Sequence, residues 1–352
     1  MKHSLSASPN LAYDPRGASS QTPSMDDTAV SPTPLSAFKR PVLSIVGPTA
    51  SGKSDLAQAV ALALDGEVVS ADSMQIYRGM DIGTAKLSAE ERLVPHHLID
   101  IINPGQSYSA QQFQDQARKA FQDIYDRRKV PILCGGTGFY VQAALEEMHF
   151  PEGEQDDNPV RIFYESFQEK EGNQALWDLL NDKDPASAAL IHPNNFKRVI
   201  RALEMHEEGI SYAEQSKNIK ALPEAVWSLR FFLQIDPLVL AQRINARVDA
   251  MREAGLVEEV EALIAQGFES ALTAPQAIGY KEIIAAKRGE LTMDEAFEQI
   301  KTATRRYAKR QRSWFRRDKR LITLDAEHCS LEDLTATIAE QYRDACSTPP
   351  MS

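Results

Sequence analysis

The residues with the clearest chemical meaning form the segment GPTASGKS at positions 47–54. This segment matches the pattern G-x-x-x-x-G-K-[ST], follows an apolar run at 42–46 and precedes a helix-forming stretch at 55–64. Glycines in such a loop let backbone N–H groups turn toward phosphate oxygens, and the start of a helix favours negative charge. Lysine would neutralise the phosphates, and the last hydroxyl would ligate magnesium. The predicted diphosphate- or triphosphate-binding residues are Gly47, Pro48, Thr49, Ala50, Ser51, Gly52, Lys53 and Ser54, with Ser54 as the metal ligand.

Two polar residues follow the next expected strands. Asp72 ends the strand expected at 68–72, so its carboxylate should project at the same edge of the sheet as the phosphate loop. An acid there either holds magnesium or accepts the proton of an attacking group, whereas the structural alternative is a turn-forming aspartate. Thr137 follows two glycines after the strand expected at 130–134. Its hydroxyl either faces the same crevice or caps the next helix, and the sequence leaves both open.

Two clusters of cations have a binding interpretation and a plain one. Arg243 and Arg247 lie four residues apart on an expected helix, and therefore on one face. They would clamp a leaving diphosphate, or they are exposed and solvated. Lys197, Arg198 and Arg201 form a similar cluster with the same two interpretations.

A strongly basic segment lies near the end of a chain whose net charge is −11. Residues 301–320 contain ten lysines and arginines and a single acid, Asp318. The self-repulsion of such a stripe favours a phosphate-backbone partner over a merely solvated helix face. The helix face expected to pack on the core carries Phe297, Ile300, Thr304, Tyr307, Gln311 and Trp314. The charged face carries Lys301, Arg305, Lys309, Arg312 and Arg316.

The order of expected elements predicts the fold class. Strands expected at 42–46, 68–72 and 130–134 alternate with helices at 55–64 and 109–127. Alternating strands and helices imply a parallel sheet covered on both faces, with ligands at the carboxyl ends of the strands. We therefore expect an α/β fold, a P-loop NTPase-like parallel sheet flanked by helices, with an inserted helical subdomain.

The insertion is expected where strand patterns disappear, at 151–225. Strands resume at 229–235 and 321–324, and Asp236 would cap the helix that follows the first of these strands. The expected division is a disordered tail at 1–38, a catalytic core at 39–150 and 226–328, the insertion at 151–225, and a C-terminal helix and tail at 329–352.

Composition places the chain among globular proteins, with 352 residues of which 43% are hydrophobic. We find neither an apolar run long enough to span a bilayer nor a secretory signal, so we expect a cytoplasmic monomer without a membrane partner. Cys134, Cys329 and Cys346 are too scattered for a disulfide framework or a zinc site. The adjacent His96 and His97 would point in different directions, so they are not expected to ligate a metal.

Six segments together resemble the signature set of the tRNA dimethylallyltransferase family. The resemblance runs from about residue 41 to 325. It implies transfer of a dimethylallyl group from dimethylallyl diphosphate to the exocyclic amine of the adenosine 3′-adjacent to the anticodon in certain tRNAs. It also implies dependence on Mg²⁺ and an insertion that grips the tRNA anticodon arm. The segments are GPTASGKS at 47–54, DSMQIYRGMDIGTAK at 72–86, PHHLID at 95–100, GGTGFY at 135–140, QAIGYKE at 276–282 and KRQRSWFR at 309–316.

The resemblance implies roles for particular residues as well. Asp72 and Thr137 would position and activate the adenine amine, and residues 49–54 would hold the diphosphate. Nothing after Arg320 has the cysteine and histidine spacing of the zinc finger in some eukaryotic members, so the resemblance is to the bacterial type. The residues that would contact tRNA are Asp72, Ser73, Met74, Gln75, Thr137, Lys197, Arg198, Val199, Ile200, Arg201, Gln276, Ala277, Ile278, Gly279, Tyr280, Lys281, Lys309, Arg310, Gln311, Arg312, Ser313, Trp314, Phe315 and Arg316.

Two other functions remain as alternatives. A P-loop kinase that phosphorylates a small metabolite would use Asp72 as its base, but it would leave the basic helix without a role. An RNA-binding module with a nucleotide switch would use the basic helix and the phosphate loop without forming a product. A chemically modified tRNA is the outcome that separates the transferase from both.

Overall fold

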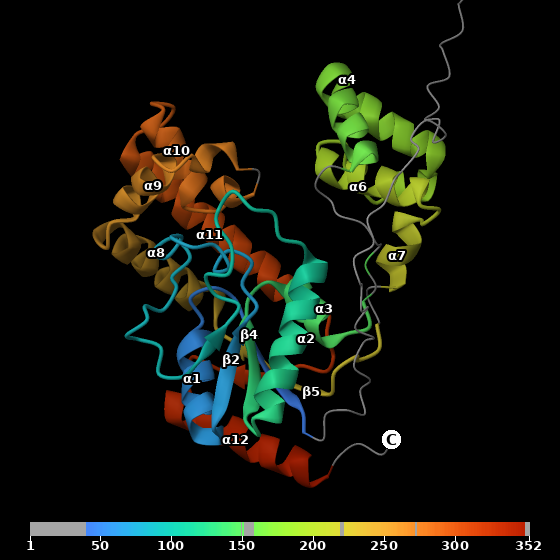
Figure 1. Ribbon diagram of the computed structural model, residues 1–352. Coiled ribbons are helices and arrows are strands. Elements are labelled where there is room, and N and C mark those ends of the chain that lie inside the picture. The colour runs from blue at the N-terminus through green and yellow to red at the C-terminus, as the bar shows by residue number, and fades with distance from the viewer. Residues whose placement is uncertain (1–39, 149, 151–157, 219–221, 272, 349–352) are drawn as a thin grey trace, which may run out of the picture. The chain divides into compact units, whose positions relative to one another are not determined.

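The described residues form one parallel sheet that is flanked by helices (Figure 1). The computed structural model describes residues 40–348 apart from 149, 151–157, 219–221 and 272. The tail expected at 1–38 and the first residues of the expected insertion lie outside the described residues. Within the described part, six strands pair in parallel in the order β3-β2-β4-β1-β5-β6. The strands are β1 (Val42–Val46), β2 (Gly66–Ser70), β3 (His96–His97), β4 (Val130–Gly135), β5 (Ser228–Gln234) and β6 (Ile322–Asp325).

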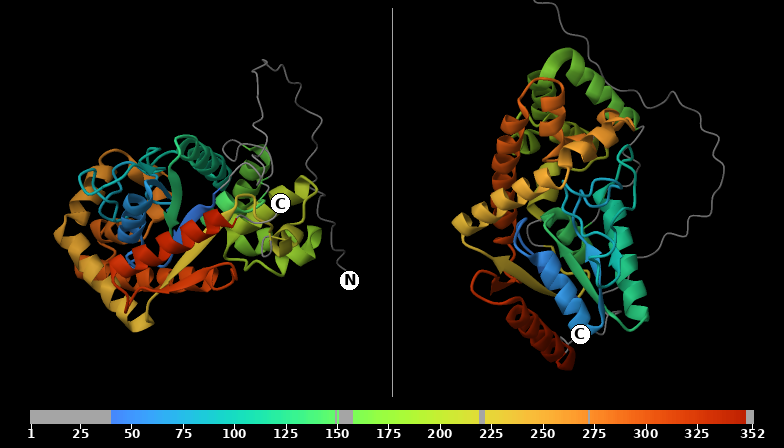
Figure 2. Two further views of the ribbon diagram at one scale, coloured as in Figure 1. Left: turned by 90° about the horizontal axis from the view of Figure 1, so that it is seen from below. Right: turned by 90° about the vertical axis from the view of Figure 1, so that its left-hand side faces the viewer.

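The central strand β1 is buried on both faces, as a strand of a parallel sheet covered by helices should be. Side chains alternate between the two faces of a strand. Leu43 and Ile45 therefore pack in one cluster with α1 (Lys53–Leu64) and α12 (Leu331–Ser347), which lie side by side in Figure 2. Val42 and Val46 pack in the opposite cluster with α2 (Ala110–Asp126) and α3 (Gly138–Leu145).

Local capping signals place several helices where the sequence predicts them. The Ser109 side chain caps α2 by accepting a hydrogen bond from the Gln112 backbone N–H. The Gln112 side chain in turn accepts one from the Ser109 backbone N–H. Asp236 caps α8 (Pro237–Glu253) by accepting from the Leu238 backbone N–H. The α/β class and the parallel P-loop-like sheet are thus confirmed. The second strand ends at Ser70, so Asp72 lies two residues beyond it and not at its last position.

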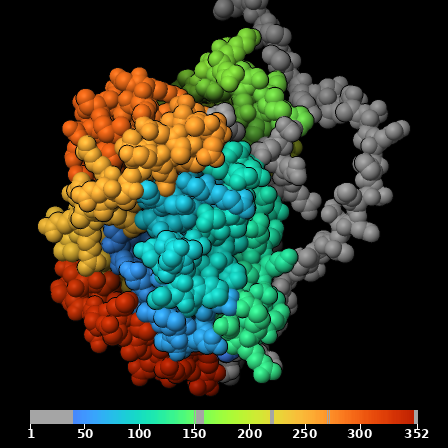
Figure 3. Space-filling model, turned by 60° about the vertical axis from the view of Figure 1, so that its left-hand side comes forward, coloured from blue at the N-terminus to red at the C-terminus, as the bar shows by residue number. Residues whose placement is uncertain are grey.

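A second group of helices follows β5 and forms a cluster of its own. It contains α8, α9 (Leu256–Ile264), α10 (Tyr280–Lys287) and α11 (Met293–Phe315), with the short 3₁₀ helices η4 (Phe268–Ser270) and η5 (Ala274–Gln276) between them. Ile76, Tyr77 and Met80 from the long segment after β2 are buried in the same cluster. In Figure 3 this segment lies on the surface beside these helices. The helices therefore hold a long stretch of chain that has little regular structure of its own.

The described part of the expected insertion is helical. Its helices are α4 (Pro159–Lys183), α5 (Pro185–Ala188), α6 (Phe196–Glu207) and α7 (Tyr212–Asn218). They share a separate hydrophobic cluster that includes Leu176, Leu180 and Leu203. Gly172, with φ of 89°, interrupts α4. No helix among the residues described is both long and apolar enough to cross a membrane.

The backbones that leave β2 and β4 approach each other closely. The Ala71 backbone N–H donates to the Cys134 carbonyl at 2.8 Å, and the Thr137 backbone N–H donates to the Ala71 carbonyl at 3.2 Å. A Cβ atom on Gly135 would lie 2.3 Å from the Ala71 carbonyl oxygen. A real Cβ does not approach a backbone oxygen that closely, so only glycine fits at position 135.

We predict that Gly135→Ala lowers the free energy of unfolding by about 2 kcal/mol or more, because the new methyl group must push two backbones apart. Denaturant unfolding measures this change. Gly105→Ala is the matched control, since a Cβ at the exposed Gly105 would have no neighbour within 4 Å. Equal stability of the two variants would show that the strand ends have room to separate.

Candidate active site

The phosphate loop has the backbone geometry of an anion-binding site. Ala50 and Gly52 both have positive φ, 62° and 83°, which turns successive backbone N–H groups inward to form a concave nest. Helix α1 begins directly after Gly52, and no side chain caps its start. The first N–H groups of the helix therefore have no partner within the helix and carry its positive dipole end. Loop and helix together offer several N–H donors to one anion.

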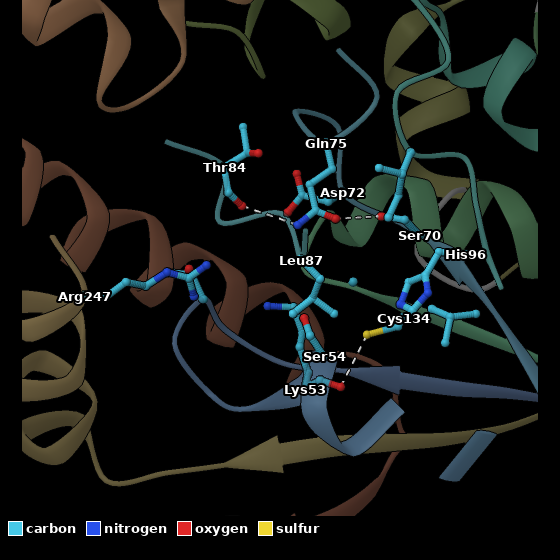
Figure 4. Close-up of a pocket in the computed structure, with 14 residues that line it drawn as sticks. Lys53, Ser54, Ser70, Asp72, Gln75, Thr84, Leu87, His96, Cys134 and Arg247 are labelled. Atoms are coloured by element: carbon cyan, nitrogen blue, oxygen red, sulfur yellow. Dashed lines mark hydrogen bonds between the residues drawn. The ribbon is translucent and has the colours of Figure 1, made fainter. Parts of the chain in front are cut away.

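A pocket opens beside this loop at the carboxyl ends of the strands (Figure 4). Thr49, Lys53 and Ser54 line it from the loop and α1. Asp72 lines it from the segment after β2, and Arg247 reaches in from α8. Sequence segments almost 200 residues apart therefore supply one carboxylate and two cations to the same pocket.

The two cations are partly buried in the pocket. Burial lowers the pKa of Lys53, and Cys134 and Asp72 partly oppose that shift, while Arg247 adds to it. Burial likewise lowers the pKa of Arg247, and Asp72 is the main group that opposes it. Desolvated cations next to each other repel, so an anionic ligand would relieve the cost of keeping both in the pocket.

Cys134 lies in the same pocket, but its thiol is not reactive. Burial raises the pKa of its thiol to about 12, even though the neighbouring Lys53 lowers it. The Sγ atom lies 3.5 Å from the Lys53 carbonyl oxygen, to which the thiol donates. A thiol with such a pKa stays protonated and is not a nucleophile.

Asp72 forms a turn and also faces the pocket. Its Oδ1 atom accepts a hydrogen bond of 2.9 Å from the Met74 backbone N–H, which is the turn role that the sequence left as an alternative. The turn uses one carboxylate oxygen and orients the group. Because a carboxylate has two oxygens, the turn is compatible with a second contact in the pocket.

Thr137 occupies the N-cap position of α3, but its hydroxyl makes no capping hydrogen bond. The hydroxyl oxygen instead accepts from the Ser73 backbone N–H at 3.1 Å and lies 3.3 Å from the Ser73 hydroxyl. Of the two roles left open by the sequence, side-chain capping is therefore wrong. Thr137 fastens the segment that carries Asp72 to the start of α3.

Sequence reasoning missed Tyr307, which it assigned to the core-facing side of the basic helix. Burial, together with the charge of Asp72, raises the pKa of the Tyr307 hydroxyl to about 12, and the nearby Thr137 and Gln311 side chains oppose that shift. The helix period correctly predicted that Tyr307 faces inward. The part of α11 around Tyr307 faces the candidate site, however, and the helix period does not reveal which residues of other elements lie there.

Glu259 was missed as well, because nothing in its neighbourhood along the chain marks it. Its carboxylate accepts from the backbone N–H groups of Asp81, Ile82 and Gly83 at 2.7–3.2 Å and from the Tyr280 hydroxyl at 2.6 Å. A carboxylate surrounded by backbone donors fixes the shape of that loop. The loop leads directly to Thr84, which lines the pocket.

Side chains of the segment DSMQ at 72–75, together with Lys86, hold the loop that leads to Thr84. Gln75 accepts from the Ser70 hydroxyl at 3.1 Å and donates to the Thr84 carbonyl at 3.3 Å. The buried ammonium of Lys86 pairs with Asp81 and Asp100 at 2.6 and 2.5 Å. These bonds give structural roles to residues of the segment at 72–86, which phosphate binding alone does not require.

Of the remaining predicted cations, one lines the pocket and the others do not. Arg247 lines the pocket, whereas Arg243, one turn earlier, is exposed and does not line it. Arg247 is therefore the better placed of the two arginines, and a clamp formed by both stays a prediction. In α6, Lys197 and Arg198 are exposed, and Arg201 pairs with Glu204 on its own helix at 3.2 Å.

Several residues expected to contact tRNA are buried and cannot present their side chains to a partner. Each packs inside the protein because it lies on the inward face of its helix or turn. Gly279 is buried with φ of 100°, which positions the start of α10. Exposed or partly exposed are Ser73, Met74, Gln75, Gln276, Ala277, Ile278 and Lys281. The buried side chains, for which a direct tRNA contact is wrong, are Val199, Ile200, Tyr280, Gln311 and Phe315.

The basic helix α11 is only partly a free charged face. Lys301 pairs with Asp249 of α8 at 2.8 Å and with Glu298 at 2.9 Å, and Arg305 donates to Asn245 at 2.6 Å. The expectation of a stripe without acids is therefore wrong at its N-terminal end, because α8 supplies them. Further along, Arg312 and Trp314 are partly buried, and the exposed residues of the motif are Lys309, Arg310, Ser313 and Arg316.

The two adjacent histidines make separate contacts. The His97 Nε2 atom lies 2.8 Å from Glu67, and the His96 Nδ1 atom lies 2.8 Å from the Val94 carbonyl oxygen. Only His96 lines the pocket. In the portion of the chain with described coordinates, no three His, Cys, Asp or Glu side chains cluster in a way that could hold a metal.

Fold and pocket together define a P-loop-type protein with an anion-binding loop, a carboxylate and two desolvated cations in one pocket. The chain matches the IPP transferase family over residues 75–318, and it belongs to that family. It is 47% identical to a tRNA dimethylallyltransferase of Exiguobacterium sp. over 296 residues, which cover 84% of this chain and 93% of the relative. It is 46% identical to a tRNA dimethylallyltransferase of Carboxydothermus hydrogenoformans, with 84% and 96% covered.

Solved structures agree with this assignment. A tRNA delta(2)-isopentenylpyrophosphate transferase from Staphylococcus epidermidis is 40% identical, with a TM-score of 0.64 over 87% of this chain and 99% of that one. A eukaryotic dimethylallyltransferase acting on tRNA is 28% identical, with a TM-score of 0.71 over 89% of this chain and 81% of that one. Both similarities extend over nearly the whole described chain.

We predict that Lys53→Ala weakens the binding of inorganic diphosphate about 10- to 100-fold, because a charge-assisted contact in a desolvated pocket is lost. Isothermal titration calorimetry measures this affinity. Lys129→Ala is the control. Lys129 pairs with the exposed Asp65 at the C-terminal end of α1, and it does not line the pocket. Wild-type affinity of the Lys53 variant would place the diphosphate elsewhere.

Proposed function

We propose that the protein transfers a dimethylallyl group from dimethylallyl diphosphate to the exocyclic amine of the adenosine 3′-adjacent to the anticodon in certain tRNAs. The observation that carries this proposal is the pocket in which Asp72 lies together with Lys53 and Arg247. The names of the relatives support a tRNA transferase over a small-metabolite kinase. The basic exposed residues of α11 also have a role in a transferase that they lack in a kinase.

In the proposed step, the carboxylate and the cations of the pocket have different tasks. The adenine amine is a poor nucleophile because its lone pair is delocalised into the ring. As the carbon–nitrogen bond forms and the carbon–oxygen bond to the diphosphate breaks, Asp72 accepts the proton that leaves the amine. The turn that Asp72 forms with the Met74 backbone N–H holds the carboxylate in one orientation for this transfer.

The departing diphosphate gains charge during the step, so groups that stabilise it accelerate the reaction. The inward N–H groups of the phosphate loop, Lys53 and Arg247 are placed to do this. The Ser54 hydroxyl lines the same pocket and fits Mg²⁺, which prefers one or two protein oxygens together with ligand phosphates and waters. Bound there, Mg²⁺ would add positive charge next to the leaving group.

The tRNA is proposed to lie along the exposed face of α11. Lys309, Arg310 and Arg316 are exposed there, and among the described residues none of the three forms an ion pair with an acid, unlike Lys301 at the N-terminal end of the helix. Cations of this kind bind phosphates without regard to sequence and give a salt-dependent affinity. The target base must leave its stack to reach a pocket of this kind. Arg312 and Trp314, which are partly buried, are placed beside this surface.

Mass analysis of tRNA after incubation with dimethylallyl diphosphate and magnesium tests the proposal. We expect tRNA to gain the mass of one dimethylallyl group in place of a hydrogen. A kinase would consume ATP and leave the tRNA mass unchanged, and an RNA-binding switch would form no product. Either of these results would overturn the proposed activity.

For the base, we predict that Asp72→Asn slows single-turnover transfer by about 100-fold or more, the usual scale for loss of a general base. Asparagine keeps an oxygen that can accept from the Met74 N–H, so the turn should persist and both substrates should still bind. A melting curve measured on the same sample reports folding. A well-folded variant with near-normal transfer would remove Asp72 from the mechanism.

For the tRNA surface, we predict that the double variant Lys309→Ala/Arg316→Ala weakens tRNA binding and flattens its salt dependence. Each lost phosphate contact lowers the slope of log affinity against log salt by about 0.9. Filter binding at several salt concentrations measures the slope. The control is Lys119→Ala/Arg343→Ala, which removes the same charge from exposed positions on α2 and α12. An identical slope in both double variants would mean that this face of α11 is only solvated.

A further inference from the structure

Gln311 of α11 lies between the phosphate loop and the GGTG segment after β4. Its side chain is 5% exposed. The Oε1 atom accepts a hydrogen bond of 2.9 Å from the Thr49 backbone N–H, and the Nε2 atom donates one of 3.0 Å to the Gly136 carbonyl. One carboxamide therefore joins two loops that belong to different strands.

The two bonds require this particular functional group. Thr49 offers a donor and Gly136 offers an acceptor, and a carboxamide presents an acceptor atom and a donor atom side by side. The fit at the Gly136 end is close, since a Cβ added there would lie 2.1 Å from the Nε2 atom. A side chain of the same length without these atoms would leave buried backbone groups without partners.

The bonds of Gln311 extend a chain of contacts to Asp72. Gly136 is followed by Thr137, whose hydroxyl accepts from the Ser73 backbone N–H at 3.1 Å. Tyr307, one turn before Gln311 on the same helix, lies near both Thr137 and Gln311. Helix α11 therefore holds the ends of β1 and β4 directly, and the segment after β2 through Thr137.

The same stretch of helix has two faces with different tasks. Tyr307, Gln311 and Phe315 recur every four residues and point inward, whereas Lys309 and Arg310 are exposed. The inward face contacts the phosphate loop, and the outward face is the surface proposed for tRNA. A motif that looks from sequence like a uniform RNA contact is thus divided by the helix period.

We propose that Gln311 is a positioning residue for the diphosphate site, a role that rests on the proposed function of the phosphate loop. By holding Thr49, it fixes the start of the nest formed by the next residues, among them Ala50 and Gly52. A loop that is already fixed pays less conformational entropy when its N–H groups close on an anion. Gln311 acts through Thr49 and touches neither reacting group.

The experiment compares Gln311→Met with Gln299→Met, the same substitution at an exposed glutamine on the same helix. Calorimetry with inorganic diphosphate and magnesium should show about tenfold weaker binding for Gln311→Met, since two buried hydrogen bonds are lost. In steady-state transfer, the KM for dimethylallyl diphosphate should rise by a similar factor while the KM for tRNA changes less than twofold. Gln299→Met should match the wild type in all three measurements.

Gln311→Asn is the second variant, because it keeps the carboxamide but is one methylene too short to reach both loops. It should show the same loss of diphosphate affinity and the same split between the two KM values. Unchanged diphosphate affinity in either folded variant, or an equal rise in both KM values, overturns the positioning role. If the wild type itself binds no diphosphate, the proposed function of the loop fails, and that result is distinct from equal affinity in wild type and variants.

Discussion

The close approach of backbones at the carboxyl ends of β1, β2 and β4 is the constraint on which the rest of the structure depends. Parallel strands bring their carboxyl ends to one edge, and here Gly135 removes the side chain that would keep two of them apart. Lys53, Asp72 and Thr137 then emerge from three different strand ends within one small region. None of them is near another along the chain, and the sheet alone makes them neighbours.

Regular hydrogen bonding ends where the strands end, so side chains must fix the loops that form the site. Three such contacts do this from separate directions. Glu259 accepts from three successive backbone N–H groups of the loop at 81–83, and Lys86 pairs with Asp81 of that loop and with Asp100. Gln311 joins the phosphate loop to the segment after β4. Because each contact satisfies buried backbone or charged groups, losing any one leaves a polar group without a partner, which costs more than a surface bond.

Several charged side chains are also paired with opposite charges within the fold. The buried Arg230 pairs with Glu146, Glu224 and Asp318 at 2.8–2.9 Å, and two of these acids flank the helical insertion. The ends of the insertion and the end of α11 therefore meet at one guanidinium. Lys301 is neutralised by acids of α8 and its own helix. What remains exposed is a short basic surface on an acidic protein, and this localisation suits a polyanionic partner better than the net charge suggests.

The sequence by itself determined what depends on local pattern. The phosphate loop, the parallel α/β class, the cap at Asp236 and the inward face of α11 follow from spacing, capping chemistry and helix period. Only the tertiary structure decided which residues share the pocket. It placed Arg247 there and left Arg243 in solvent, and it gave the inward-facing Gln311 its partners Thr49 and Gly136. The physical reason is that periodicity fixes the direction of a side chain relative to its own helix, whereas its partners come from strands and loops far away in the chain.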